Sequence, residues 1–272
     1  MAKQLKPVEL FLALSLTATL GACNNPATEG GEGGEGTEAT PTEEVTPVDE
    51  GGEGGEGGEG GEGGASGNSD VDFMTALGLM KGHLMVAGEL REQGNYEEAQ
   101  AHIQHPVEEL YGTIEDELSD RDIEPFKTEL TQLQDLAQSA PEDPETEAAY
   151  EKAMAEIDDA IATLPEDQTQ SPEFIMDVVN EMLATAGEEY EAAIADDKIV
   201  EIVEYQDSRG FVMYAEELYQ NVADQLSSED ADAIATAFTE LKTAWPSVTP
   251  PDTPVKSPSE VLGLISQIEL NS

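Results

Sequence analysis

The stretch MKGHLMVAGELREQGNYEEAQAHIQHPVEELY, residues 80–111, predicts two helices folded back on each other. Apolar residues recur at helical spacing on both sides of the Gln-Gly-Asn sequence at 93–95, which is typical of a short helix–helix connection. The same stretch contains all three histidines of the chain, His83, His102 and His105. It therefore sets the expected fold and is also the first place to look for chemistry.

The apolar period of about 3.6 continues from residue 70 to the end of the chain. We predict an all-α fold of two up-down four-helix units, about eight helices in total, at residues 70–164 and 171–272. Further helix starts are indicated near Asp122, with Pro125 in the first turn, at Asp143-Pro144 and at Ser171-Pro172. A turn at Asp196-Asp197 is expected to lead to a helix from about 198 to 225. Ser228 is predicted to cap the next helix, and Ser257-Pro258 to start the last one.

The two units are related in sequence. Residues 107–119 read VEELYGTIEDELS and residues 215–227 read AEELYQNVADQLS, with seven of thirteen positions identical. Ala-Gly-Glu at 87–89 recurs at 186–188. We interpret this as an internal duplication, and in its register Met213 stands opposite His105 and Gly210 opposite His102. Histidine is therefore not needed to build such a unit.

The N-terminus is typical of an export signal. Lys3 and Lys6 precede the apolar run LFLALSLTATL at 10–20, which is too short to span a bilayer. The following Leu-Gly-Ala-Cys resembles a bacterial lipobox, which implies removal of residues 1–22 and lipidation of Cys23. Asn24 after the cysteine favours the outer membrane, facing the periplasm, in a bacterium with two membranes. Cys23 is the only cysteine, so disulfides and cysteine-based metal sites are excluded.

Residues 23–69 are predicted to form a disordered tether after the lipidated cysteine. They contain the run GGEGGEGGEGGEGG at 51–64 and no basic residue, so no core can form there. The whole chain has a formal net charge of -49. Binding to nucleic acid is therefore excluded, because it requires lysine and arginine to neutralise phosphate. Membrane attachment is expected through the lipid alone.

A helical wheel places Glu98, His102, His105 and Glu109 in one strip, at spacings of four, three and four. Imidazole and carboxylate groups bind divalent transition metals. His83, on the preceding helix, is expected at about the level of residues 105–106. We therefore predict a metal site, for iron, copper or zinc, made by His83, His102, His105, Glu98 and Glu109.

Pro106 sharpens this prediction, because it has no N–H to donate to the carbonyl of His102 and is expected to kink the helix beside the histidines. Two alternatives stay open. The histidines are either solvated or hydrogen-bonded to nearby carboxylates, or they bind haem non-covalently through His83, His105 or Met80. Separation of the three imidazoles by more than roughly 10 Å would remove the basis of a shared site.

A second polar patch, EYQDSRGF at 204–211, lies inside the long helix of the second unit. For Arg209 we favour an ion pair with an interior Asp or Glu over a role in holding a carboxylate ligand. The chain contains no GxSxG, HExxH, phosphate-binding loop or dinucleotide-binding glycine fingerprint, so we predict that it is not an enzyme.

The order of lipobox, tether and two related helical units resembles bacterial helical lipoproteins of the imelysin-like and iron-uptake EfeO type. That family carries a G-x-H-x-x-E motif. Here Gly82 directly precedes His83 and Val86 replaces the glutamate, so no family residue is transferred. The sequences GHL, HPVEELY and EYQDSRGF also resemble signatures of an uncharacterised helical lipoprotein family.

Two functions are expected from the sequence. The first is a metal-binding lipoprotein of the cell envelope, with the site on the first helical hairpin. The alternative is a non-catalytic scaffold or adaptor lipoprotein whose acidic helices bind another envelope protein.

Overall fold

The computed structural model describes residues 66–272. The predicted signal segment, the lipidated Cys23 and nearly all of the tether lie outside these residues. Among the helices described, none is both long enough and apolar enough to cross a lipid bilayer. The described part is helical apart from one two-stranded sheet, so the prediction of an all-α fold is confirmed.

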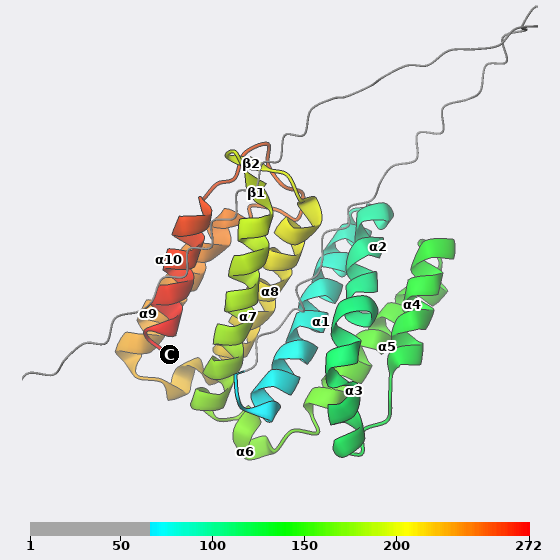
Figure 1. Ribbon diagram of the computed structural model, residues 1–272, viewed down its shortest axis with the longest axis horizontal. Helices are drawn as coiled ribbons and strands as arrows, with labels where there is room; N and C mark the ends of the chain where they lie inside the picture. Colours follow the sequence, from blue (N-terminus) through cyan, green and yellow to red (C-terminus); the bar gives the residue numbers. More distant parts are fainter. Residues whose placement is uncertain (1–65) are drawn as a thin grey trace, which may run out of the picture. The chain divides into compact units, whose positions relative to one another are not determined.

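The first unit contains four helical rods, of which the second is interrupted (Figure 1). The first rod is α1 (Ser69–Glu92). The second consists of α2 (Tyr96–His105), η1 (Pro106–Leu110) and α3 (Tyr111–Asp120). The third and fourth are α4 (Lys127–Ser139) and α5 (Pro144–Ile161). Asn68 caps α1 and Asp143 caps α5, each by accepting a hydrogen bond from a main-chain N–H of the first turn.

The second unit repeats this four-helix plan after the short α6 (Glu166–Thr169). Its elements are α7 (Pro172–Ala192), β1 (Ile194–Ala195), β2 (Lys198–Ile199), α8 (Ile202–Val222), η2 (Ala223–Gln225), α9 (Ser228–Leu241), η3 (Lys242–Ala244) and α10 (Pro258–Glu269). Ser171 and Ser257 cap α7 and α10 as expected, and Pro172 and Pro258 occupy the first helical positions.

Two predicted helix starts and one predicted helix cap were wrong. Asp196 and Asp197 both have positive φ, as a two-residue hairpin turn requires, so residues 198–199 form a strand and α8 starts only at Ile202. Asp122 also has positive φ, which ends α3 and delays α4 until after Pro125. Ser227, not Ser228, caps α9.

The helix break at Pro106 takes the form of a π-turn. The N–H of Tyr111 donates to the carbonyl of Pro106, five residues earlier, and η1 continues into α3. Pro106 has no N–H with which to continue the α-helical pattern after His105. Single π-turns inside α-helices are frequent at functional sites.

The two units meet where α1 crosses α8 (Figure 1). Gly82 of α1 and Gly210 of α8 lie at this crossing. A Cβ on Gly210 would overlap the main-chain carbonyl of Gly82, and a Cβ on Gly82 would meet the backbone of Gly210 and Phe211. The absence of both side chains therefore lets the helix backbones touch. Core residues of both units join in one buried cluster around this crossing.

Two structural correspondences support the internal duplication. Tyr111 and Tyr219 are equivalent in the repeat, and the hydroxyl of each is hydrogen-bonded to the main chain of a residue further along the sequence. The Tyr111 hydroxyl accepts from the N–H of Phe126, and the Tyr219 hydroxyl donates to the carbonyl of Ala231. Gly88 on α1 packs on Tyr150 of α5, and Gly187 on α7 packs on α10. The repeated sequences thus occupy similar places in both units.

The substitution Gly210→Ala tests the helix crossing. The new methyl group meets the Gly82 carbonyl, and backbone cannot move aside as a flexible side chain can. We expect a loss of about 1–3 kcal/mol in the free energy of unfolding, the usual cost of overpacking. Urea denaturation followed by circular dichroism measures it.

Gly112→Ala is the matched control, because nothing lies within 4 Å of a Cβ at this position in α3. Replacing glycine inside a helix then raises stability by roughly 0.5–1 kcal/mol. Equal stability of the two variants would contradict the close helix crossing.

Candidate metal centre

The glycine crossing places His83 of α1 against Asp207 of α8. His83 follows Gly82 directly, and Asp207 lies one helical turn before Gly210. The Nδ1 atom of His83 lies 2.6 Å from Oδ1 of Asp207, and both side chains are fully buried. Phe211 packs edge-on against the His83 ring, with ring centroids 4.8 Å apart.

Two further histidines approach Asp207 from α2. His102 and His105 are three residues apart and share one helix face. Nδ1 of His102 lies 2.7 Å from Oδ1 of Asp207, and Nδ1 of His105 lies 3.2 Å from Oδ2. His105 is the last residue before the π-turn, and its side chain is 17% exposed, whereas that of His102 is fully buried.

These four side chains, His83, His102, His105 and Asp207, each offer one ligand atom, and the four atoms all lie within 4.8 Å of one another. Around a tetrahedral ion with bonds of about 2.0–2.1 Å, neighbouring ligand atoms are about 3.3 Å apart. The observed nitrogen-to-oxygen distances of 2.6, 2.7 and 3.2 Å are all shorter than that spacing. A modest outward shift would admit an ion.

Two buried polar atoms of this group have no hydrogen-bond partner. Nδ1 of His105 and Oδ2 of Asp207 are 3.2 Å apart, yet their angles do not make a hydrogen bond, and neither has another partner. An unsatisfied buried polar atom costs about 1–3 kcal/mol. Both atoms belong to members of the group of four, so the residues fit a bound metal ion.

The electrostatics of the group favour a charged carboxylate. Burial disfavours the ionised form of Asp207, but His83 and His102 outweigh this effect and hold its pKa well below the usual range. Burial likewise disfavours the charged form of His105. The Asp207 carboxylate outweighs burial there, and the pKa of His105 is raised. The site therefore presents a fixed negative charge inside a helical interface.

Of the five residues predicted as ligands, the group of four includes the three histidines but neither glutamate. All three histidines lie together, with ring centroids 4.8 Å apart for His83 and His105 and 6.0 Å apart for His102 and His105. Glu98 and Glu109 are not among the four. Glu98 accepts a hydrogen bond from Gln206, and Glu109 lies 3.9 Å from Nε2 of His105.

Asp207 is the residue that sequence reasoning missed. The signal was present in the polar patch at 204–211, because a carboxylate inside an otherwise apolar helix needs partners. The sequence could not show that α8 lies against the histidines. In the same patch Arg209 pairs with Glu89 of α1 at 2.7 Å, the ion pair favoured from the sequence.

Buried contacts hold α8 in place behind Asp207. The indole N–H of Trp245 donates to Oγ of Ser208 at 2.9 Å, and that hydroxyl donates to the carbonyl of Tyr205 at 2.8 Å. The segment after α9 is thereby fastened to the helix that carries the carboxylate. The position of Asp207 depends on packing within the second unit as well as on the crossing with α1.

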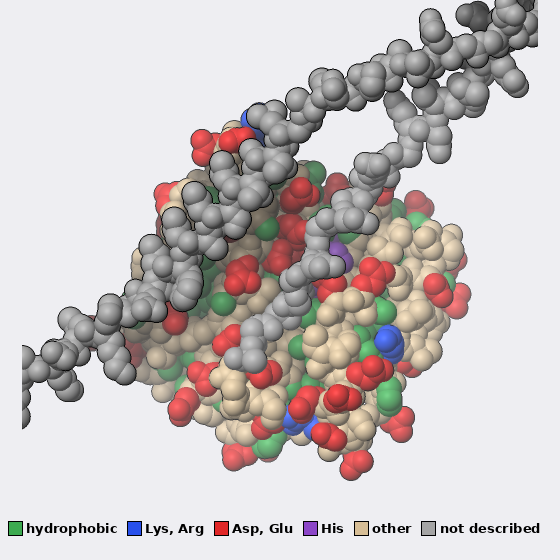
Figure 2. Space-filling view, viewed as in Figure 1, with side chains coloured by type: hydrophobic (Ala, Val, Ile, Leu, Met, Phe, Trp, Pro, Cys, Tyr) green, Lys and Arg blue, Asp and Glu red, His purple; other side chains and the backbone are tan. Residues whose placement is uncertain are grey.

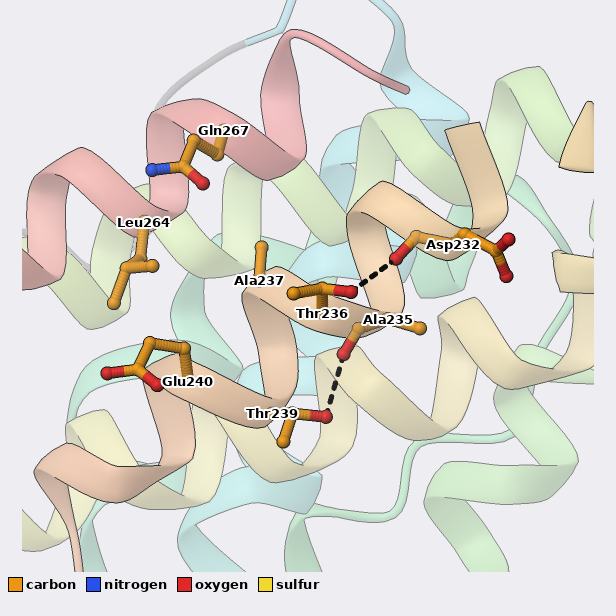
Figure 3. A pocket seen from close by; sticks show the side chains of 8 residues that line it. All are labelled: Asp232, Ala235, Thr236, Ala237, Thr239, Glu240, Leu264 and Gln267. Atoms are coloured by element: carbon orange, nitrogen blue, oxygen red, sulfur yellow. Dashed lines mark hydrogen bonds between the residues drawn. The ribbon is translucent and has the colours of Figure 1, made fainter. Parts of the chain in front are cut away.

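Acidic side chains cover much of the visible surface, and histidine shows only as a small area among them (Figure 2). A separate groove runs between α9 and α10 (Figure 3). Its hydroxyls bond to their own helix: Thr236 donates to the carbonyl of Asp232 and Thr239 to that of Ala235. This groove has no convergent set of polar groups, so the histidine group is the stronger candidate.

Comparison with known proteins gives one family. Residues 165–272 match the model of an iron permease-associated 4-helix bundle domain. No curated protein and no solved structure matches the chain. The matched region is the second unit, which supplies Asp207, whereas the three histidines belong to the first unit. The four-helix bundle expected for residues 171–272 agrees with this match.

The raised pKa of His105 predicts a pH effect on stability in the presence of a chelator. A histidine whose pKa is higher in the folded chain than its ordinary value of 6.5 stabilises fully below that value. This stabilisation is lost as the pH rises through the folded pKa. The free energy of unfolding should therefore fall as the pH rises above about 6.5.

His105→Gln removes this titration and should flatten that part of the profile. The variant also controls for the many carboxylates, which titrate alike in both chains. Urea denaturation of both proteins at each pH measures the difference. Parallel profiles for the two chains would contradict the ion pair between His105 and Asp207.

Proposed function

We propose that the chain binds one divalent transition-metal ion through His83, His102, His105 and Asp207. The observation that carries this proposal is the convergence of three imidazoles from two helices on a single buried carboxylate. Two of the converging atoms, on His105 and Asp207, have no hydrogen-bond partner. A bound ion would satisfy both.

The donor set narrows the choice of metal. Imidazole nitrogen suits iron, zinc, copper and nickel, whereas calcium and magnesium prefer oxygen ligands. No cysteine sulfur belongs to the group of four, which argues against a site for monovalent copper. The likeness of residues 165–272 to an iron permease-associated domain supports iron as the first choice.

We further propose that the protein holds the ion for exchange at the cell envelope and does not catalyse a reaction. Three of the four ligand side chains are fully buried, which leaves little room for a substrate. His105 is the one partly exposed member, and Glu109 stands beside it. Ions would therefore enter and leave past these two residues. The lipobox around Cys23 supports a lipid anchor on the outer side of a membrane.

Metal binding is tested on the full chain, purified in detergent and titrated with Fe²⁺ without oxygen, then with Zn²⁺ and Cu²⁺. Wild type should bind a single ion. Asp207→Asn keeps the size of the side chain and removes its charge, and His105→Gln removes the most exposed ligand. Each should weaken binding by more than about tenfold, which corresponds to about 1.4 kcal/mol.

Glu108→Gln is the matched control, because Glu108 lies in the same π-turn and pairs with Gln134 instead of the histidines. It should bind as wild type does. Glu109→Gln tests the ligand predicted from the sequence, and we expect only a small change. Equal affinity in wild type, Asp207→Asn and His105→Gln would contradict the site.

The lipid anchor is tested separately. Cys23→Ser should abolish incorporation of a labelled fatty acid and release the chain from the membrane fraction. Each acyl CH₂ contributes roughly 0.8 kcal/mol to membrane binding, so loss of the lipid leaves little attachment. Cys23→Ser should still bind the ion, because the site lies in the helical part. A variant that stays lipidated or stays on the membrane would refute the anchor.

A further inference from the structure

Gln206 connects the metal ligands to two acceptors outside the group. Its Nε2 donates to Oε2 of Glu98 at 2.7 Å and to the main-chain oxygen of Val248 at 3.2 Å. Its Oε1 lies 2.8 Å from Nε2 of His102. Gln206 and His102 are both fully buried, so bulk water does not compete for these contacts.

The two acceptors fix the orientation of the Gln206 amide. A carboxylate and a main-chain carbonyl can only accept, so the NH₂ end must face Glu98 and Val248. With the amide turned over, its oxygen would face two further acceptors in a buried environment, at the cost of unmet hydrogen bonds. The carbonyl end therefore faces His102. An acceptor at that distance requires an N–H on Nε2 of His102.

We propose that Gln206 fixes the proton of His102 on Nε2 and so leaves Nδ1 as the nitrogen that binds the metal ion. This inference rests on the proposed metal site. Without the ion, Nδ1 donates a second N–H to the Asp207 carboxylate. A bound metal ion replaces that proton, and the lone pair is then on Nδ1 because Nε2 keeps its N–H. Nδ1 lies 2.7 Å from Oδ1 of Asp207, on the side of the ring where the other ligands gather.

Gln206 is thus a positioning residue that acts through His102 and not on the ion itself. Glu98 belongs to the same chain of contacts, because it holds the Gln206 amide. Hydrogen bonds to the second nitrogen of a metal-binding histidine orient the ring and select its tautomer, and their loss lowers metal affinity by about 10–100-fold.

The test is Gln206→Met in the full chain, which keeps the side-chain length and removes the acceptor. The dissociation constants for Fe²⁺, measured without oxygen, and for Zn²⁺ should rise by about 10–100-fold. Gln220→Met, on the exposed face of the same helix, is the matched control and should bind as wild type does. Equal affinity of Gln206→Met and wild type would overturn the inference.

The exchange Glu98→Gln with Gln206→Glu tests the role of the acceptor. It keeps an oxygen facing His102 and places the amide donor at position 98, so it should recover much of the lost affinity. An exchange variant as weak as Gln206→Met, with native circular dichroism, would show that only packing had been disturbed and would count against the inference.

Nitrogen NMR of the histidine rings reads the tautomer directly and needs only the wild-type chain. The Zn²⁺-loaded protein should show a proton on Nε2 of His102 and the metal on Nδ1. Metal on Nε2 would overturn the inference, whether or not Gln206→Met folds. If wild type binds no ion, the proposed function fails, and the spectrum of the metal-free chain still decides whether Gln206 holds the proton on Nε2.

Discussion

The buried carboxylate of Asp207 is the constraint on which the arrangement of the two units depends. An ionised group without water is costly unless opposite charge or hydrogen-bond donors surround it. Asp207 obtains those donors from α1 and α2 of the other unit, because none of its close histidine partners lies on its own helix. The helix crossing at Gly82 and Gly210 brings the groups within reach. Moving α8 away from α1 would leave the carboxylate buried without its partners, so electrostatics and close packing reinforce the same interface.

The site differs in kind from the acidic surface around it. With 60 acidic residues against 11 basic ones, the chain attracts cations everywhere, but exposed carboxylates bind them weakly and with little selectivity. At the proposed site, a buried group with three nitrogen donors would select instead for transition metals, which accept imidazole readily. The acidic surface thus raises the local concentration of cations, and the partly exposed His105 separates that surface from the interior. Attraction and selection are properties of different parts of the molecule.

The sequence predicted the fold better than the site. Capping residues such as Asp143, Ser171 and Ser257 mark helix starts through local hydrogen bonds, so they can be read without knowing the fold. The turn at residues 196–197 was recognised, but its positive φ angles, which make a hairpin, depend on backbone twist that the sequence does not display. The helical wheel grouped His102 and His105 because they share one helix. It could not find Asp207, whose approach depends on two glycines 128 positions apart. It grouped Glu98 with the ligands, whereas in the structure Glu98 accepts a hydrogen bond from Gln206.

The duplication explains why the described residues form one histidine group and not two. In the repeat register, residue 210 corresponds to residue 102 and residue 213 to residue 105. The first unit has histidines at these places, whereas the second has Gly210, which permits the helix crossing, and Met213. Glu98 and Gln206 also occupy equivalent places, and they are hydrogen-bonded to each other. One copy therefore supplies the imidazole nitrogens of the group, and the other supplies the carboxylate and the space for it. A site with ligands from both copies requires that they diverge, because two identical copies could not provide both a side chain and its absence at the same position.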